Sequence, residues 1–274
     1  MEQTRFSKTT RKNIKDMAYA LITGAAKGIG KAIACELVSK GYDLLLIDLD
    51  ADGLTHTAAA LASEHQASVH TLTADLSAPE TVYRIKEWAV AFESELQVLV
   101  NNAAFGLNGA FEKLSLTEQL QIIDVNVKSV VALCHLFIPV LRQQKKAYIL
   151  NIGSNAGYQP VPYLNIYAAS KAFIVSFTRS LRYELRGSNV HVSCVSPGST
   201  DTSFVDRAGM SSAIRKTAGR YNMSAAEVAK IAVRALFNKR KERITGVQTK
   251  LGVFLSWLAP KSWSEKFGAD IFSK

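Results

Sequence analysis

Three side chains that can hold or move a proton occur near one another in the sequence. Tyr167 follows Ser154 by thirteen residues, and Lys171 follows Tyr167 by four. Positions four apart on a helix lie on the same face, so the ammonium group of Lys171 should lie beside the phenol of Tyr167. A nearby positive charge favours the phenolate and lowers the phenol's pKa from about 10. The spacing therefore predicts a proton donor that is useful near neutral pH.

A cluster of glycines predicts a site for a dinucleotide phosphate. Residues 17 to 23 form a short apolar run typical of a buried strand, and residues 29 to 39 show helical periodicity. Between them, Gly24, Gly28 and Gly30 permit a tight turn that brings backbone N–H groups against a pyrophosphate. Their spacing differs from the commoner Gly-x-Gly-x-x-Gly pattern, and a glycine-rich turn can also be a simple connector.

Several further motifs accompany these two, and their order along the chain is informative. They are Thr23-Gly24-xxx-Gly28-x-Gly30, Asp75-Leu76, Asn101-Asn102-Ala103-Ala104, Asn126, Ser154, Tyr167-xxx-Lys171 and Pro197-Gly198-xxx-Thr202. On these motifs, residues 18 to 245 resemble the short-chain dehydrogenase/reductase family. Ala104 stands where the family usually has glycine, which is a mild change.

The resemblance implies an enzyme that interconverts a secondary alcohol and a ketone by hydride transfer, on a hydrophobic small molecule or acyl chain. Tyr167 would be the general acid and base, and Ser154 would bind the substrate oxygen. Lys171 would lower the pKa of Tyr167 and bind the nicotinamide ribose. Asn126 would hold a water that relays protons. The alternative is an inactive nucleotide-binding sensor, although such relatives usually lack the tyrosine or the lysine.

The resemblance also implies the contacts to the cofactor. The residues concerned are Gly24, Lys27, Gly28, Ile29, Gly30, Asp48, Asp75, Leu76, Asn102, Ala103, Tyr167, Lys171, Pro197, Thr200 and Thr202. Asp75 would contact adenine while Leu76 packs beside the ring. Thr200 and Thr202 would hold the nicotinamide carboxamide.

Two of these residues give opposite indications about the cofactor. Asp48 ends the second predicted strand, where a carboxylate accepts hydrogen bonds from ribose and repels a 2′-phosphate. Lys27 stands where NADP-dependent members of the family often place a base. We give Asp48 more weight because Lys27 can turn into solvent. NAD(H) is favoured and NADP(H) is the alternative.

Predicted strands and helices alternate along the chain. Strands are expected at 18–23, 43–48, 68–72, 98–101, 148–153 and 190–196, and helices at 29–39, 52–64, 78–94, 117–142, 164–186 and 224–238. This alternation predicts the α/β class, with a Rossmann-like doubly wound parallel sheet and helices on both faces. By resemblance, the fourth and fifth of these helices would form the interface of a homodimer or homotetramer; the alternative is burial within the monomer.

The length of 274 residues and 48% hydrophobic content fit a single domain with two appendages. We assign residues 1–16 to a basic N-terminal extension and residues 17–246 to the catalytic domain, with a substrate lid at 203–222. Residues 247–274 form an apolar and basic C-terminal tail. This tail should form two short amphipathic helices joined at Pro260, which contact a membrane surface, line a substrate entrance, or cover the core or a neighbouring subunit.

Charge and targeting signals indicate where the protein works. The net charge is +10, and residues 203–274 hold 14 Lys and Arg against 5 Asp and Glu. This excess fits a solvated face, anionic lipid or an acidic carrier protein, whereas no nucleic-acid recognition motif accompanies it. Neither a signal peptide nor an uninterrupted run of about 18 apolar residues is present. We expect a cytoplasmic protein, with peripheral membrane contact as an option, and no metal.

Overall fold

Strands and helices follow one another largely as the sequence predicts. The computed structural model describes residues 18–201, 204–212, 214 and 222–273. The strands are Tyr19–Thr23 (β1), Asp43–Asp48 (β2), Val69–Thr73 (β3), Leu96–Asn101 (β4), Ala147–Ile152 (β5), Val190–Ser196 (β6), Thr200–Asp201 (β7), Met223–Ser224 (β8) and Glu242–Ile244 (β9). The helices are Gly28–Val38 (α1), Ala51–His65 (α2), Thr81–Ala89 (α3), Leu116–Ile123 (α4), Ser129–Leu141 (α5), Asn165–Glu184 (α6), Phe204–Arg207 (α7), Ala225–Phe237 (α9), Val247–Leu258 (α10) and Lys261–Phe272 (α11).

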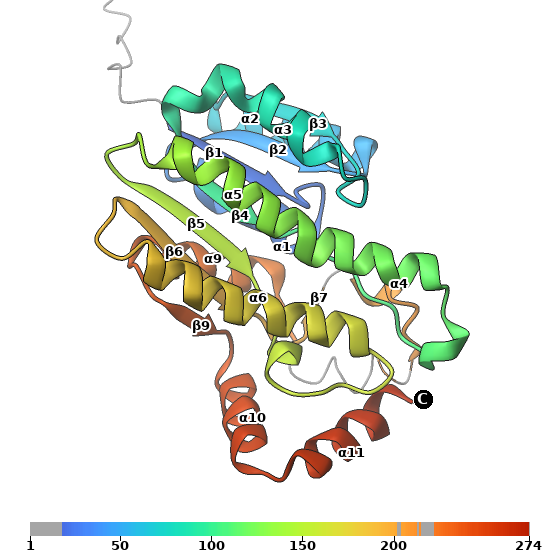
Figure 1. Ribbon diagram of the computed structural model, residues 1–274. Helices are drawn as coiled ribbons and strands as arrows, with labels where there is room; N and C mark the ends of the chain where they lie inside the picture. Colours follow the sequence, from blue (N-terminus) through green and yellow to red (C-terminus); the bar gives the residue numbers. More distant parts are fainter. Residues whose placement is uncertain (1–17, 202–203, 213, 215–221, 274) are drawn as a thin grey trace, which may run out of the picture.

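Parallel pairing arranges these strands into one main sheet (Figure 1). Within the described residues, seven strands pair in the order β3-β2-β1-β4-β5-β6-β9, and every pair is parallel. The direction of strand addition reverses between β1 and β4, which leaves a crevice at the carboxyl ends of the strands. The predicted doubly wound sheet in a single α/β domain is confirmed. The prediction missed β9, because its three residues give too short a pattern to recognise.

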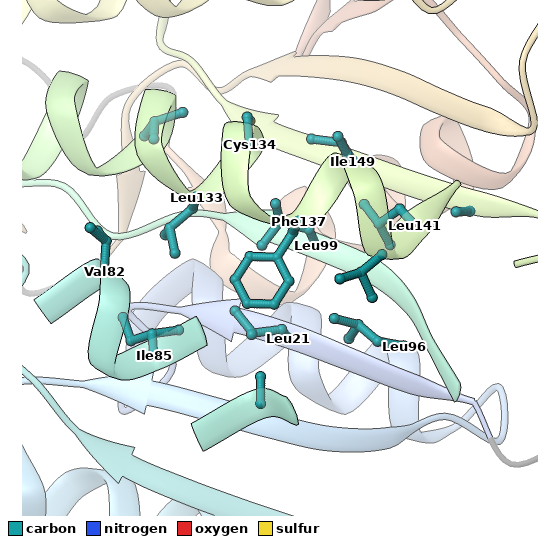
Figure 2. Packing of buried hydrophobic residues seen from close by; sticks show 14 of the residues in the cluster. Leu21, Val82, Ile85, Leu96, Leu99, Leu133, Cys134, Phe137, Leu141 and Ile149 are labelled. Carbon is teal, nitrogen blue, oxygen red and sulfur yellow. The ribbon is translucent and has the colours of Figure 1, made fainter. Parts of the chain in front are cut away.

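Alternating side chains on each strand cover the two faces of the sheet. Leu21 of β1 packs with α3, α5 and α6, whereas Ala20 and Ile22 pack on the opposite face with α1, α2 and α9. Figure 2 shows the ring of Phe137, from α5, among aliphatic side chains that include Leu99. This packing holds the helices against the two faces of the sheet.

The helix predicted at 117–142 is interrupted in the structure. A π-helical turn, Asp124–Lys128 (η3), separates α4 from α5. By length and composition, the whole segment Leu116–Leu141 would be able to cross a membrane. Core helices of soluble proteins meet the same criterion, and here Phe137 and Leu141 are fully buried against the sheet. We therefore describe it as a core helix.

The C-terminal tail forms two helices that project from the sheet (Figure 1). Helices α10 and α11 are joined at Pro260, which is the N-cap of α11, so the predicted pair of helices is confirmed. The proposed N-terminal extension lies outside the described residues, and the proposed lid is described only in part. The described part of the proposed lid begins with the short helix α7.

Candidate active site

The predicted glycine turn connects β1 to α1 and leaves no room for side chains. Gly24 and Gly28 have φ angles of +68° and +59°, a region that favours glycine. A Cβ atom on Gly30 would lie 1.9 Å from the carbonyl oxygen of Gly24. A Cβ atom on Gly24 would lie 2.8 Å from the Cα of Ala103, in the loop that follows β4. Backbone is therefore exposed where a ligand can approach it closely.

Asn102 fixes this turn to the neighbouring strand. Its Nδ2 donates to the carbonyl oxygens of Thr23, at 3.0 Å, and Gly24, at 2.9 Å. The hydroxyl of Thr23 accepts hydrogen bonds from the backbone N–H groups of Asn102, at 3.1 Å, and Ala103, at 3.2 Å. The carboxyl ends of β1 and β4 are thus locked together on either side of the crevice.

The start of α1 suits an anion. The N-cap of this helix is Lys27, which makes no side-chain capping bond, and the first turn contains no acidic residue. Its Ile29 is packed against the core. Helix N-termini present unpaired N–H groups and a partial positive charge. The glycine turn leaves a space that a Cβ atom would fill, and this space lies next to the N-terminus of α1. Together they fit a dinucleotide pyrophosphate.

Asp48 lies at the carboxyl end of β2, beside the glycine turn. Its Oδ2 accepts a hydrogen bond from the backbone of Ala26 at 2.8 Å, and its Oδ1 accepts one from the backbone of Asp50 at 3.0 Å. Lys27 pairs with the carboxylate of Asp50 at 3.3 Å, and the two side chains are 61% and 40% exposed. Exposed ion pairs are weak, so this pair leaves Lys27 able to turn away.

Four other predicted cofactor residues lie around this centre. Asp75 closes its own turn, since its Oδ1 accepts from the backbone and hydroxyl of Ser77 at 2.8 Å each. Leu76 is buried in the core rather than exposed at a surface. Pro197 and Thr200 follow β6, and the Pro197 carbonyl accepts from the backbone N–H of Asn155. Thr202 lies outside the described residues.

The structure brings Ser154, Tyr167 and Lys171 together. Ser154 follows β5, where its hydroxyl caps a short helix, Asn155–Tyr158 (η4), and it hydrogen-bonds with Tyr167 in the first turn of α6. One turn later, the Nζ of Lys171 lies 5.7 Å from the centre of the Tyr167 ring. It donates to the carbonyl oxygen of Ile152, the last residue of β5, at 2.9 Å. The predicted shared face of Tyr167 and Lys171 is confirmed.

The expected direction of the pKa shift on the tyrosine is wrong for this arrangement. Burial raises the pKa of Tyr167, while its hydrogen bond with Ser154 acts in the opposite direction. Burial also lowers the pKa of Lys171 to about 8. Desolvation penalises both charged forms, and at this separation it outweighs the effect of the ammonium group on the phenol.

The side chain of Asn126 binds the loop after β4 and helix α6. It is buried in η3, where its Nδ2 donates to the carbonyl oxygen of Phe105 at 2.9 Å and to the Ser170 hydroxyl at 3.0 Å. Its Oδ1 accepts from the backbone N–H of Phe105 at 3.1 Å. The Ser170 hydroxyl in turn donates to the carbonyl oxygen of Tyr167 at 2.7 Å. The Asn126 side chain therefore ties the loop after β4 to the helix that carries Tyr167.

A polar cluster that the sequence did not reveal supports the turn of Ser154. The hydroxyl of Tyr158 donates to Oε1 of Glu242, on β9, at 2.5 Å and lies 3.1 Å from the Ser196 hydroxyl. Nε of Arg179, on α6, donates to Oε2 of Glu242 at 2.5 Å. Burial, and then Glu242, raise the pKa of Tyr158, so it stays protonated. Glu242 is the acceptor that joins this cluster, and it lies on β9. The sequence would have indicated the cluster only if β9 had been recognised as a strand.

Aromatic side chains cover the centre from the lid side. The ring of Phe204, on α7, lies 4.8 Å from the ring of Tyr167. The guanidinium of Arg207 lies 5.0 Å from the centre of the Phe105 ring. These contacts place a largely apolar wall beside the Tyr167 phenol. Among the residues that the structure describes, no three His, Cys, Asp or Glu side chains are grouped to hold a metal ion.

A nucleotide crevice next to a half-buried tyrosine and a buried lysine defines an oxidoreductase site of the Rossmann type, and comparison with known proteins agrees. The family model described as short chain dehydrogenase matches residues 18–212. Sulfoacetaldehyde reductase 2 of Chromohalobacter salexigens is 36% identical over 187 residues, which cover 67% of this chain and 73% of that protein.

Two solved structures are also similar. A short-chain dehydrogenase from Sphingobium yanoikuyae in complex with NADPH has a TM-score of 0.78 and 27% identity, covering 88% of this chain and 94% of that one. One from Burkholderia phymatum in complex with NAD has a TM-score of 0.81 and 28% identity, covering 89% and 94%. This chain belongs to the short chain dehydrogenase family, and it is an NAD(P)-dependent oxidoreductase.

Proposed function

We propose that the protein interconverts a secondary alcohol and a ketone, with Tyr167 as the general acid and base. The observation that carries the proposal is the juxtaposition of Tyr167, Ser154 and Lys171 at the carboxyl end of β5, beside the crevice that Asn102 and the glycine turn form. The apolar wall of Phe204 favours a hydrophobic small molecule or an acyl chain as the substrate.

Each of the three side chains has a distinct task in carbonyl reduction. A bound nicotinamide dinucleotide supplies the hydride. Tyr167 donates its phenolic proton to the substrate oxygen, and its raised pKa keeps that proton in place until charge develops on the oxygen. The Ser154 hydroxyl donates a hydrogen bond to the same oxygen and stabilises its negative charge. In the reverse direction Tyr167 accepts the proton.

Lys171 serves the phenol when it becomes charged. Its ammonium group stabilises the phenolate of Tyr167 by attraction across a site with little water. It can also donate to the ribose hydroxyls of the cofactor, since an ammonium has three donors and the Ile152 carbonyl uses one. Asn126 positions the helix of Tyr167, and any water relay past it would use its backbone carbonyl.

Removal of the Tyr167 hydroxyl tests the proposed role. Tyr167→Phe should lower kcat with NADH and a panel of ketones by about a thousandfold, the range of general acid catalysis. Binding of NADH, measured by its fluorescence, should remain within a fewfold of the parent. Tyr183→Phe, at an exposed tyrosine near the far end of α6, is the matched control and should retain turnover. Normal turnover in Tyr167→Phe would refute the role, and a parent that binds NADH but reduces none of the ketones would support the inactive sensor.

We propose NAD(H) as the preferred cofactor, with NADP(H) as the alternative. Support comes from Asp48, whose carboxylate is held by the backbone of Ala26 beside the glycine turn, and from the weak exposed pairing of Lys27. The ratio of kcat/KM for NADH to that for NADPH measures the preference. It should exceed one in the parent and fall at least tenfold in Asp48→Ala, which removes the repulsion of a 2′-phosphate. A parent that prefers NADPH would overturn the proposal.

We also propose a homodimer or homotetramer that works in the cytoplasm. Apolar side chains are exposed along α4, α5 and α6, among them Leu120, Val131 and Phe173. Phe173 is stacked on Phe177 with ring centres 5.8 Å apart, which makes a continuous apolar surface. Cell fractionation tests the location, and secretion of the protein would contradict it.

A further inference from the structure

Helix α10 is folded with its polar side inward. Its buried residue is Ser256, and Thr249 lies against Gly198 of the domain. The opposite side of the helix presents large apolar side chains to solvent, and these are Val247, Leu251, Phe254, Leu255, Trp257 and Leu258. A helix that covers a core buries its apolar face instead. The apolar face of α10 is therefore free to contact a partner outside the domain, such as another protein chain or a lipid surface.

Helix α11 also turns small and polar residues inward, while Phe272 at its far end packs against the buried cluster that includes Val161 and Leu164. Its Ser264 and Gly268 are buried, and Gly268 approaches the ring of Pro162. Trp263 is 70% exposed, and Lys266, three positions later, is exposed on the same side of the helix. Exposed tryptophan next to lysine suits the boundary between lipid headgroups and acyl chains.

The two helices contact the rest of the domain only over part of their length within the described residues. A cavity of about 690 Å³ separates α11 from the start of α6, and its walls include Pro160, Ala168 and Glu265. At the far end, the carbonyl oxygen of Phe272 accepts a hydrogen bond from Asn108 at 3.1 Å. The helices thus pack on the domain through small and polar residues and through Phe272, and they lie apart from the main sheet (Figure 1).

Charge identifies the occupant of this face. Residues 239–274 contain 8 Lys and Arg against 3 Asp and Glu, a net charge of +5; four of the eight basic residues precede α10, at positions 239–241 and 243, and α10 and α11 themselves hold three lysines against two acidic residues. A second copy of the chain would bring the same positive charge to the contact, whereas an anionic bilayer attracts it at about 1 kcal/mol, or fivefold, for each basic residue near the surface. We propose that the outward faces of α10 and α11 bind the surface of a bilayer containing anionic lipid. Lipid binding by this surface does not depend on catalytic activity, so it can be tested separately from the function proposed above.

Tryptophan emission gives a direct test, because Trp257 and Trp263 are two of the three tryptophans in the chain. The full-length protein is mixed with phosphatidylcholine vesicles and with vesicles in which about a third of the lipid is phosphatidylglycerol. Sedimentation and a blue shift of emission are expected with the anionic vesicles only, and both should weaken at high salt. Absence of binding to anionic vesicles at low salt would overturn the proposal.

Paired substitutions separate the contribution of each side chain. Trp257→Ser with Trp263→Ser should lower vesicle binding at least tenfold, and Lys250→Gln with Lys266→Gln should lower it about 25-fold, at fivefold for each lysine. The matched control is Tyr183→Ser on α6, which removes an exposed aromatic ring elsewhere and should bind as the parent does. Circular dichroism and turnover of a water-soluble ketone check the fold. Unchanged binding in both pairs, or dissociation of an oligomer by the tryptophan pair without any vesicle binding, would overturn the proposal.

Discussion

Lys171 occupies an environment that disfavours its own charge. It is 3% exposed, and its ammonium group has one hydrogen bond to the Ile152 carbonyl, whereas the proposed reaction needs two further partners for it. Burial lowers its pKa from 10.5 to about 8. Such strain at a functional site is tolerated when it serves the chemistry, because the rest of the fold holds it in place.

Replacement of Lys171 should therefore stabilise the protein while it removes activity. At pH 7 the lysine is protonated in both states, and the difference between 10.5 and about 8 corresponds to about 3 kcal/mol lost from the folded state. Lys171→Met should raise the free energy of unfolding at pH 7 by about 1–3 kcal/mol, after the loss of one hydrogen bond worth about 1 kcal/mol.

The pH dependence identifies the cause. Between pH 8 and 10.5 the folded protein releases the Lys171 proton before the unfolded chain does, so the penalty fades as pH rises through this window. Urea denaturation of the parent and of Lys171→Met at pH 7 and pH 10 gives the free energy of unfolding of each protein. The difference between the two proteins should be smaller at pH 10 than at pH 7. A variant that is equally destabilised at both pH values would show that burial does not govern this lysine.

At the scale of elements, the site depends on contacts between segments far apart in sequence. The turn η4 that begins at Ser154 is held to the edge strand β9 and to α6, because Glu242 accepts from both Tyr158 and Arg179. Likewise η3 places Asn126 against Phe105 and the helix of Tyr167. Contacts with β9 thus position the turn of Ser154, and contacts with η3 position the helix of Tyr167. Local helix geometry alone would not fix either position.

Loss of the Glu242 carboxylate should loosen this arrangement. Glu242→Ala leaves the Tyr158 hydroxyl with Ser196 alone and should lower the free energy of unfolding by about 1–3 kcal/mol. Thermal denaturation measures the effect, and kcat should fall more than KM rises because the Ser154 turn shifts. The control is Lys128→Ala, which breaks an exposed pair with Asp124 and should cost about 0.5 kcal/mol or less. Equal stability losses in the two variants would contradict the supporting role.

At the scale of the whole molecule, exposed apolar side chains of the described residues gather on two separate surfaces. One lies along α4, α5 and α6, and the other on α10 and α11. Exposed apolar area of this extent marks interaction surfaces. We propose that the first surface contacts other subunits and that the second contacts lipid.

A charge placed on α6 should separate the subunits. Phe173→Asp buries a carboxylate at the proposed interface, which costs several kcal/mol, and should convert the oligomer to monomer. Light scattering coupled to gel filtration measures the mass. Val90→Asp replaces another exposed apolar side chain away from α6 and should leave the mass unchanged. A parent that is already monomeric would contradict the proposed oligomer.

Much of this protein was determined by local sequence. The alternation of apolar runs indicates strands and helices, and the glycine spacing fixes a backbone turn that side chains would block at Gly30. The four-residue spacing of Tyr167 and Lys171 sets their common face, since helix geometry alone decides it. These features depend on neighbours in the chain, and sequence reasoning recovered them.

Tertiary structure decided the rest. The raised pKa of Tyr167 comes from burial by distant segments, and spacing along one helix gives no measure of it. The partners of Asn126 and Glu242 come from strands and loops brought together by the sheet. The outward apolar face of α10 likewise follows from how the helix docks on the domain, because an amphipathic sequence does not say which side faces inward.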